Sequence, residues 1–175
     1  MRRKGFTLME MMVVTAMMAI LAIIIAPRLR DQVAKAQDAR TIALLGSLRT
    51  ISESYYAENQ KKPYGEEDPI LANTFDEVQN KDKLALNLLI PHLNIEGQKE
   101  FGSNGVWDPS DGYTVKIGGA RDQQKSPVKY GGDIGYTFHA PEGVSADGIS
   151  LWFIQKTLNP DSREYDTRGK KWIDY

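Results

Sequence analysis

The sequence predicts an α+β fold: a long N-terminal α-helix, hydrophobic in its first half and amphipathic in its second, packed against a small antiparallel β-sheet. Three observations lead to this prediction. Residues 6–26 form an apolar run, residues 33–55 repeat apolar side chains every three or four positions, and three later segments alternate apolar and polar residues. At 175 residues the chain has the size of one domain, or of one domain plus an anchor.

Composition excludes several kinds of site. The chain has no cysteine, so disulfides, iron–sulfur clusters and thiolate zinc sites are excluded. Its formal net charge is −1, which becomes −4 if Arg2, Arg3 and Lys4 are removed by processing after Gly5. An acidic body of this kind gives no reason to expect nucleic-acid binding through bulk charge.

The apolar run is long enough to cross a membrane. From Phe6 to Ala26 it has 21 residues, which make about 32 Å of helix against a bilayer core of about 30 Å. A cleaved secretory signal is the alternative, but its apolar core is shorter, at about 7–15 residues, and it ends in an A-x-A-like site that this run lacks. Charge does not orient the span, because three basic residues precede it and three closely follow it: Arg2, Arg3 and Lys4, then Arg28, Arg30 and Lys35.

One carboxylate, that of Glu10, lies just inside this run. A lone charge in hydrocarbon costs roughly 2.5–3.5 kcal/mol at mid-helix and less near the boundary, so we expect Glu10 to have a role. Thr7-x-x-Glu10 fits a capping box, in which Glu10 satisfies backbone N–H groups at the start of the helix. A cap at membrane depth would still leave a charge to be neutralised.

The stretch Lys4-Gly5-Phe6-Thr7-Leu8-Met9-Glu10, followed by a long apolar helix, resembles the class III signal of type IV prepilins and of the pseudopilins of type II secretion. The resemblance implies that residues 1–5 are a leader peptide. A prepilin peptidase would cut the Gly5–Phe6 bond, and the new N-terminus at Phe6 would be N-methylated. The likeness is close over about the first thirty residues. Later segments are similar only in pattern to the end of the long helix and the start of the sheet in pilins: 51–59 with Pro63, and 107–109.

Cleavage would give Glu10 a partner. The freed amino group of Phe6 has a reference pKa near 8 and stays cationic if methylated once. An amine and a carboxylate in hydrocarbon largely offset each other, whereas either alone is strongly unfavourable. In the resembled family the amine belongs to a neighbouring subunit, which makes Glu10 a docking device. Pairing within one chain, four residues apart, and the capping box are the alternatives, and Glu10 can also be capped before assembly and paired afterwards.

Two further features of the span bear on assembly. Four alanines lie on one helix face, where small side chains let helices approach closely, although ordinary alanine usage also explains them: Ala16, Ala19, Ala22 and Ala26. Pro27 removes the hydrogen bond to the carbonyl of Ile23, so the helix is expected to bend, melt locally or stop. In the resembled family a proline here lets part of the helix unwind within the filament; a break between anchor and soluble domain is the alternative.

Residues 6–27 are expected to form the transmembrane and assembly half of the helix, and the helical pattern resumes in residues 28–58, the amphipathic half. We expect its apolar face to include Val33, Ala36 or Gln37, Leu44, Leu48, Ile51 and Tyr55. Charged residues are expected on the other faces: Arg30, Asp31, Lys35, Asp38, Arg40, Arg49 and Glu53. With the span, this helix would measure about 78 Å and end near Glu58. Its apolar face needs a cover.

The cover is expected in a globular head, residues 59–175, with an αβ-loop, a sheet of three or four strands and a C-terminal tail. Alternation predicts strands around Tyr113–Ile117, Ile134–Phe138 and Ile149–Phe153, with turn signals at 108–112 and 146–148. The connection 59–105 is expected to hold a short helix, Lys81–Ile90, stopped by Pro91. Many pilins staple the tail with a disulfide; here, residues 156–175 must be held by packing of Tyr165, Trp172 and Tyr175.

No enzyme is expected. His92 and His139 are far apart and lack neighbouring acidic or serine motifs, which argues against a triad or a histidine metal site. Four aspartates in Gly-rich turns are open to calcium, as in some major pseudopilins, but without calcium-loop spacing turn chemistry explains them better: Asp108, Asp111, Asp133 and Asp147. We therefore predict no cofactor or metal. The short basic patch Arg168, Lys170 and Lys171 reads as a solvated tail.

The resemblance implies a structural subunit of a type IV pilus-like filament. The precursor would be a single-pass protein of the inner membrane with its head outside the cytoplasm, and its partners would be like subunits, the prepilin peptidase/N-methyltransferase and an inner-membrane assembly platform. The product would be an extracellular pilus or a periplasmic pseudopilus. A secretion pseudopilin is the alternative, and a singly anchored extracytoplasmic binding or enzymatic domain is a remoter one.

Overall fold

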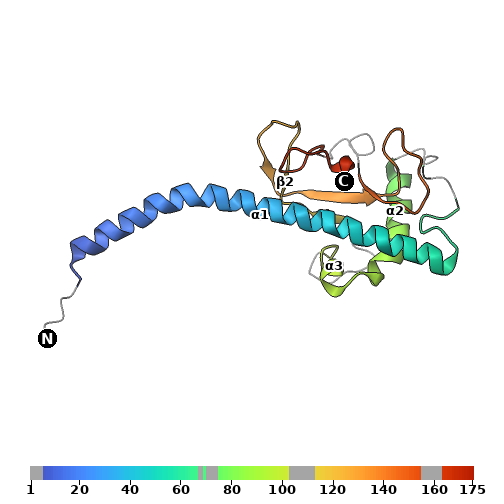
Figure 1. Ribbon diagram of the computed structural model, residues 1–175, viewed down its shortest axis with the longest axis horizontal. Helices are drawn as coiled ribbons and strands as arrows, with labels where there is room; N and C mark the ends of the chain where they lie inside the picture. The colour runs from blue at the N-terminus through green and yellow to red at the C-terminus, as the bar shows by residue number, and fades with distance from the viewer. Residues whose placement is uncertain (1–5, 67–68, 70–74, 103–112, 155–162) are drawn as a thin grey trace. The chain divides into compact units, whose positions relative to one another are not determined.

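The computed structural model describes residues 6–66, 69, 75–102, 113–154 and 163–175, with the side chains of residues 75–79 outside this description. It divides into two compact units, Met1–Val33 and Ala34–Tyr175. Helix α1, Leu8–Asn59, belongs to both (Figure 1). A long helix that is apolar at first, followed by short antiparallel strands, confirms the predicted α+β class. The predicted start of the sheet at residues 107–109 lies outside the described residues.

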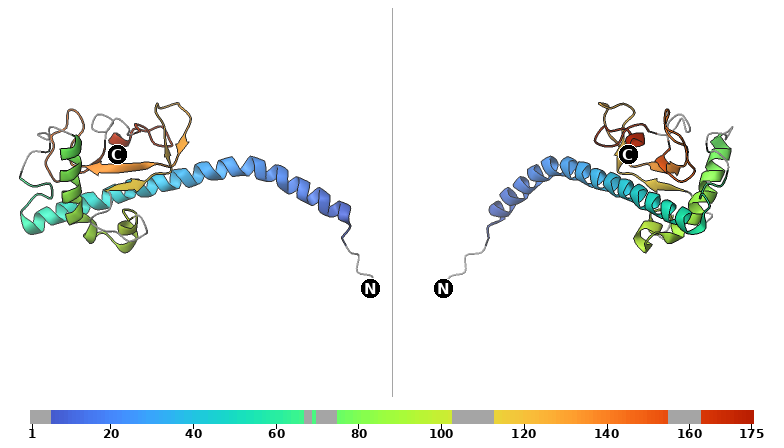
Figure 2. Two further views of the ribbon diagram at one scale, coloured as in Figure 1. Left: turned by 180° about the vertical axis from the view of Figure 1, so that it is seen from behind. Right: turned by 45° about the vertical axis from the view of Figure 1, so that its right-hand side comes forward.

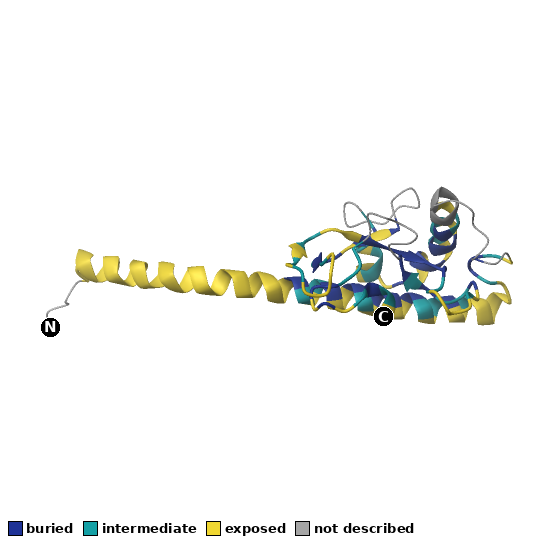
Figure 3. Cartoon of the chain, turned by 90° about the horizontal axis from the view of Figure 1, so that it is seen from above, coloured by how far each residue is buried: buried dark blue, intermediate teal, exposed yellow. Residues whose placement is uncertain are grey.

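The first unit contains the apolar half of α1. Every described residue from Phe6 to Val33 is exposed, which Figure 3 shows as an unbroken yellow ribbon. α1 continues through Pro27 as an α-helix, so it neither melts nor ends there. The sequence had left these two outcomes open beside a bend.

The second unit begins where α1 becomes buried on one side. Its buried residues are Ala34, Asp38, Thr41, Leu44, Leu45, Leu48 and Ser52. The predicted apolar face was therefore wrong in part. Val33 is 62% exposed, and Asp38, expected on a solvent-facing side, is only 1% exposed. The reason is that this side of α1 meets backbone N–H groups of the head, which need an acceptor that an apolar side chain cannot supply.

The main sheet lies along the second half of α1, as the views in Figures 1 and 2 agree. It consists of β1 (Thr114–Lys116), β4 (Asp133–Thr137) and β5 (Trp152–Phe153) in the order β1-β4-β5, all antiparallel. Val115 pairs with Ile134, and Tyr136 pairs with Phe153. The three predicted strands are confirmed, although the third is shorter than predicted: β5 begins at Trp152, so Ile149 and Leu151 lie before it. A two-stranded sheet of β2 (Gly119–Ala120) and β3 (Lys129–Tyr130) was not predicted.

The connection after α1 holds more helix than predicted. α2 spans Phe75–Leu89 and continues as the 3-10 turn η2, Ile90–His92, so the predicted helix Lys81–Ile90 begins too late. Pro91 does not stop the chain from turning, because the first positions of a new helical turn need no N–H from proline. A further short helix, α3 (Ile95–Lys99), starts at Asn94, whose side chain accepts a 2.7 Å hydrogen bond from the Gly97 N–H.

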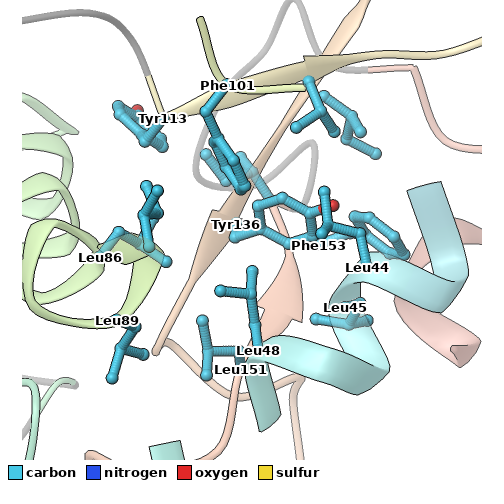
Figure 4. Close-up of a cluster of buried hydrophobic side chains, with 14 of the residues drawn as sticks. Leu44, Leu45, Leu48, Leu86, Leu89, Phe101, Tyr113, Tyr136, Leu151 and Phe153 are labelled. Atoms are coloured by element: carbon cyan, nitrogen blue, oxygen red, sulfur yellow. The ribbon is translucent and has the colours of Figure 1, made fainter. Parts of the chain in front are cut away.

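Aromatic and leucine side chains from α1, α2 and the sheet meet in one core (Figure 4). Tyr136 and Phe153 are fully buried between leucines of α1 and leucines of α2, with ring centroids 5.3 Å apart. The Tyr136 hydroxyl donates to the Thr41 carbonyl at 3.1 Å, so its polar end is satisfied. Burying side chains of this size stabilises a fold by about 1.5–3 kcal/mol each. This core supplies the cover that the amphipathic half of α1 requires.

The tail is held against the core without a disulfide. Trp172, in the 3-10 turn η3 (Trp172–Asp174), is 2% exposed and packs edge-on against Phe153 at 5.0 Å. The Tyr175 hydroxyl donates to the Asp166 carboxylate at 2.6 Å, and Tyr165 forms an antiparallel bridge with Arg121. The predicted packing of the tail is confirmed for Trp172 and Tyr175, whereas Tyr165 contributes through its backbone; residues 156–162 of the predicted tail lie outside the described residues.

Polar contacts from α1, which the sequence did not reveal, complete this attachment. The Arg49 guanidinium donates to the carbonyl of Leu151 at 2.8 Å and to that of Tyr175 at 2.7 Å. Asp38 accepts hydrogen bonds from Thr167 in the tail and from Gly118 after β1. A charged group that bonds carbonyls or N–H groups of distant segments ties those segments to the helix.

Candidate assembly site

The start of α1 is a capping box built from Thr7 and Glu10. The Glu10 carboxylate oxygen Oε2 accepts from the Thr7 N–H at 2.8 Å and from the Thr7 hydroxyl at 3.0 Å. In return, the Thr7 hydroxyl oxygen accepts from the Glu10 N–H at 3.2 Å. Two N–H groups that have no partner inside the helix are thereby satisfied. The capping box that the sequence suggested as one role of Glu10 is present in the single chain.

Apart from Thr7, the surroundings of Glu10 are apolar and open. Phe6, Met9, Val13, Val14 and Met17 line a shallow depression beside the carboxylate. No other charged residue occurs between Glu10 and Arg28, and the one polar residue in that run, Thr15, donates its hydroxyl to the Met12 carbonyl at 3.0 Å. Glu10 is therefore the single ionisable group that this part of the helix offers to a partner.

The rest of the apolar half of α1 presents exposed hydrophobic side chains on every side (Figure 3). Among the described helices, α1 alone has the length and apolar composition to cross a membrane. Large continuous apolar surface is unfavourable in water, and it is normally covered by lipid or by another protein surface. The four alanines of the predicted stripe, Ala16, Ala19, Ala22 and Ala26, are exposed like their neighbours.

The four residues predicted from sequence to serve processing and assembly do not form one cluster. Phe6 precedes the helix, is 79% exposed and lies at the same end as Glu10. Pro27 lies seventeen positions beyond Glu10 on α1, about 26 Å further along the helix axis. Gly5 lies outside the described residues. Processing at Gly5–Phe6 and docking of Glu10 on a neighbouring chain involve other molecules, so they remain predictions.

The candidate calcium ligands divide between described and undescribed parts of the chain. Asp147 accepts from the N–H groups of Ile149 and Ser150 and from the Ser150 hydroxyl at 2.7–2.8 Å, which is the turn chemistry expected of it. Partial burial opposes ionisation, but these bonds outweigh it and lower the pKa of Asp147. Asp133 is exposed at the start of β4, while Asp108 and Asp111 lie outside the described residues.

Two residues of the predicted basic patch contact other side chains, so the patch is not simply a solvated tail. Lys170 places its ammonium 3.6 Å from the centre of the Tyr175 ring, and Lys171 forms a 2.7 Å ion pair with Glu164. Among the described residues there is no group of three or more side chains suited to hold a metal ion. The two histidines lie apart: His92 is exposed in η2, and His139 is buried after β4.

The sequence did not predict that two acids of the head, Asp38 and Asp82, would be buried and bonded to distant segments. Asp38 had been expected on a solvent-facing side of α1, and Asp82 had no role within the predicted helix. Neither acid belongs to a motif with recognisable spacing, and their partners lie 56 or more positions away. Only the folded structure brings these groups together.

Comparison with known proteins finds similarity to a methylation motif and to fimbrial and pilin proteins. Residues 1–26 match the model of the prokaryotic N-terminal methylation motif. The chain is 48% identical over 56 residues to a fimbrial protein of Eikenella corrodens, which is 32% of this chain and 35% of that protein. It is 39% identical over 59 residues to a fimbrial protein of Pseudomonas aeruginosa, or 34% and 38% of the two chains. Over 79 residues it is 32% identical to a type IV major pilin of Neisseria gonorrhoeae, or 45% and 48%.

These likenesses are partial. The chain spans between about a third and a half of the length of the curated relatives it matches. No solved structure matches the chain. The activities of those relatives are therefore a basis for a proposal rather than a property already shown of this protein.

Proposed function

We propose that this chain belongs to the type IV pilin family and is a structural subunit of a type IV pilus-like filament. The observation that carries the proposal is the apolar half of α1. It is exposed on every side, it is free of charge from Met11 to Ala26, and it has a single carboxylate, Glu10, at its N-terminal end. Such a helix can lie in a bilayer or among identical helices, and it leads directly into a folded head.

The proposed precursor is stored in the cytoplasmic membrane as a single-pass protein with its head outside the cytoplasm. The membrane-embedded prepilin peptidase removes residues 1–5 by cutting Gly5–Phe6 and methylates the new amino group of Phe6. The exposed position of Phe6 ahead of the helix supports this step, because a protease needs access to extended chain. An inner-membrane assembly platform then moves the mature subunit into the filament.

Within the filament, Glu10 is proposed to pair with the N-terminal amine of a neighbouring subunit. The capping box supports this order of events, because Thr7 donates two hydrogen bonds, of 2.8 and 3.0 Å, that stabilise the carboxylate before a partner arrives. On assembly the amine neutralises the carboxylate, so each chain that enters brings the partner for a charge already in the helical core of the filament. Pro27, which leaves the Ile23 carbonyl without its helical partner, supplies a place where α1 can unwind during packing.

A pilus subunit and a secretion pseudopilin share all these features, and the fimbrial names of the relatives favour the pilus. Deletion of the gene followed by electron microscopy tests the proposal. Loss of long surface fibres, restored by the wild-type chain, is the expected result. Fibres that persist while exported enzymes accumulate in the periplasm would identify a pseudopilin instead. Fibres and secretion both unchanged would contradict the assembly function and leave the remoter alternative of an anchored binding or enzymatic domain.

A further inference from the structure

Asp82, in the middle of α2, is a buried acid that is only partly satisfied. The residue has no exposed surface. Its Oδ1 atom accepts a hydrogen bond of 3.1 Å from the Phe138 N–H, at the end of β4. Its other oxygen, Oδ2, is buried and makes no hydrogen bond among the described residues. An ionised carboxylate with one oxygen left unbonded in a core is costly, so the protonation state of Asp82 affects how α2 packs.

His139 faces that oxygen from the sheet side. The Nδ1 atom of His139 lies 3.9 Å from Oδ2 of Asp82, and the histidine is 7% exposed. This distance is within ion-pair range but longer than a hydrogen bond. The His139 ring is oriented by Thr137, whose hydroxyl lies 3.1 Å from Nδ1 and accepts a 3.1 Å bond from the His139 N–H. A buried acid on α2 and a buried imidazole just after β4 thus meet where the helix and the strand pack.

No other described group around this pair supplies the positive charge that would neutralise the Asp82 carboxylate in place of a proton. Tyr64 places its ring edge-on to His139 at 5.7 Å. Burial and the Asp82 carboxylate raise the pKa of Tyr113, which keeps its phenol neutral. Lys81 and Lys83 flank Asp82 on α2 and are partly exposed. Among the described residues, His139 is the one side chain able to carry positive charge within 4.0 Å of the Asp82 carboxylate.

We propose that Asp82 and His139 form a pH-sensitive latch, which holds α2 on the end of β4 while the pair retains a proton and loosens α2 when that proton is lost. With one proton the pair is electrically neutral, either as an acid beside a neutral imidazole or as a carboxylate beside an imidazolium. Without it, the buried carboxylate has only the Phe138 N–H and the contact with Thr137 to stabilise it. The leucines of α2 still anchor the helix in the core, so the expected motion is a local opening rather than unfolding.

The direction of the pH effect follows from Asp82. Burial raises its pKa from 3.8 to about 7, because desolvation outweighs the contacts with Thr137 and the Phe138 N–H. Asp82 therefore binds its proton more tightly in the folded state than in the unfolded state. Its stabilising contribution is full below pH 4 and is lost as the pH rises through about 7. Because His139 is present in both wild type and an Asp82→Asn variant, the difference in pH dependence between the two proteins reports the contribution of the Asp82 proton.

Loosening of α2 would alter a specific surface of the head. Leu84 and Leu88, four residues apart on α2, are 68% and 45% exposed. Because both leucines belong to α2, the exposed surface that they form is expected to be more rigid at acidic pH than at neutral pH.

Hydrogen–deuterium exchange of the full-length protein in detergent micelles tests the latch between pH 5 and pH 8, with rates corrected for intrinsic exchange. Peptides from α2 are compared with peptides from residues 34–59 of α1. In wild type, the opening constant of α2 is expected to rise at least about tenfold across this range relative to Asp82→Asn. Asp133→Asn, which changes an exposed acid at the start of β4, is the matched control and should keep the wild-type profile.

Three outcomes would overturn the latch. The first is an α2 opening constant that does not change with pH in wild type, and this result stands even if Asp82→Asn fails to fold. The second is an equal pH dependence in wild type and Asp82→Asn. The third is a rise of the same size in the α1 peptides, which would indicate general loosening of the head. None of these results bears on filament assembly, because the measurement uses the unassembled chain.

Discussion

Asp38 of α1 is bonded to Thr167 of the C-terminal tail, 129 positions later in the chain. One carboxylate oxygen accepts from the Thr167 hydroxyl at 2.6 Å and from its N–H at 3.1 Å, and the other accepts from the Gly118 N–H at 2.8 Å. A single buried acid thus ties the helix to both the sheet region and the tail. In a protein without cysteine, this non-covalent clasp attaches the tail to the helix without a disulfide.

Replacing Asp38 by alanine is expected to destabilise the head by about 2–4 kcal/mol, because two buried donors and one partly buried donor would lose their acceptor at once. Urea unfolding of the full-length protein in detergent, followed by tryptophan fluorescence, measures the change. Glu53→Ala is the control, since it removes an exposed acid from the same helix and should change stability by less than about 0.5 kcal/mol. If the two variants unfold at the same urea concentration, the clasp contributes nothing to stability.

Gly118 is expected to tolerate no side chain. A Cβ at this position would overlap the backbone carbonyl of Ala34, so Gly118→Ala must push the segment after β1 away from α1. We expect a loss of about 1–3 kcal/mol, together with a weaker Asp38 contact.

Gly46 provides the opposite case for the same substitution. It lies on the exposed side of α1, and a Cβ there would meet nothing within 4 Å. Gly46→Ala should therefore stabilise the unassembled protein by about 0.5–1 kcal/mol, because alanine is the better helix former. Thermal denaturation of both variants, monitored by circular dichroism, would contradict this account if Gly118→Ala were the more stable of the two.

What the sequence could predict depended on local pattern. The long helix and the three main strands follow from periodicity and were found. The first turns of α2 were missed because polar residues such as Asp76 and Glu77 obscure the period, and the two-residue strands β2 and β3 are too short to have one. Asp38 and Arg49 were expected to face solvent because they are charged. Their partners lie 80 to 129 positions away, and no local pattern reports them.

The processing step is tested by the mass of the mature protein. Purified from cells with an active prepilin peptidase, the chain is expected to begin at an N-methylated Phe6, because the proposed leader ends in Gly5 and residues 1–26 match the model of the prokaryotic N-terminal methylation motif. Intact-mass spectrometry would detect both changes at once. A chain that still begins at Met1 under these conditions, with the peptidase shown to process another substrate, would be incompatible with the proposal.

The role of Glu10 can be separated from its capping function by comparing two variants. Glu10→Ala removes both the cap and the carboxylate, whereas Thr7→Ala removes the hydroxyl of the capping box and leaves the carboxylate. Loss of a cap alone costs about 0.5–2 kcal/mol of helix stability and acts at an end of α1 that frays easily. Loss of the carboxylate would leave a neighbour's amine unpaired in an apolar environment, which is far less favourable.

We therefore expect Glu10→Ala to accumulate as a membrane-bound monomer with few filaments, while Thr7→Ala assembles at near wild-type yield. The ratio of sheared filament to membrane-bound subunit, measured by quantitative immunoblotting, distinguishes the cases. Equal defects in both variants would mean that Glu10 acts through the capping box. Normal filament yield from Glu10→Ala would remove the docking role altogether, because an acid whose only partner is its own helix start is not needed by a neighbouring subunit.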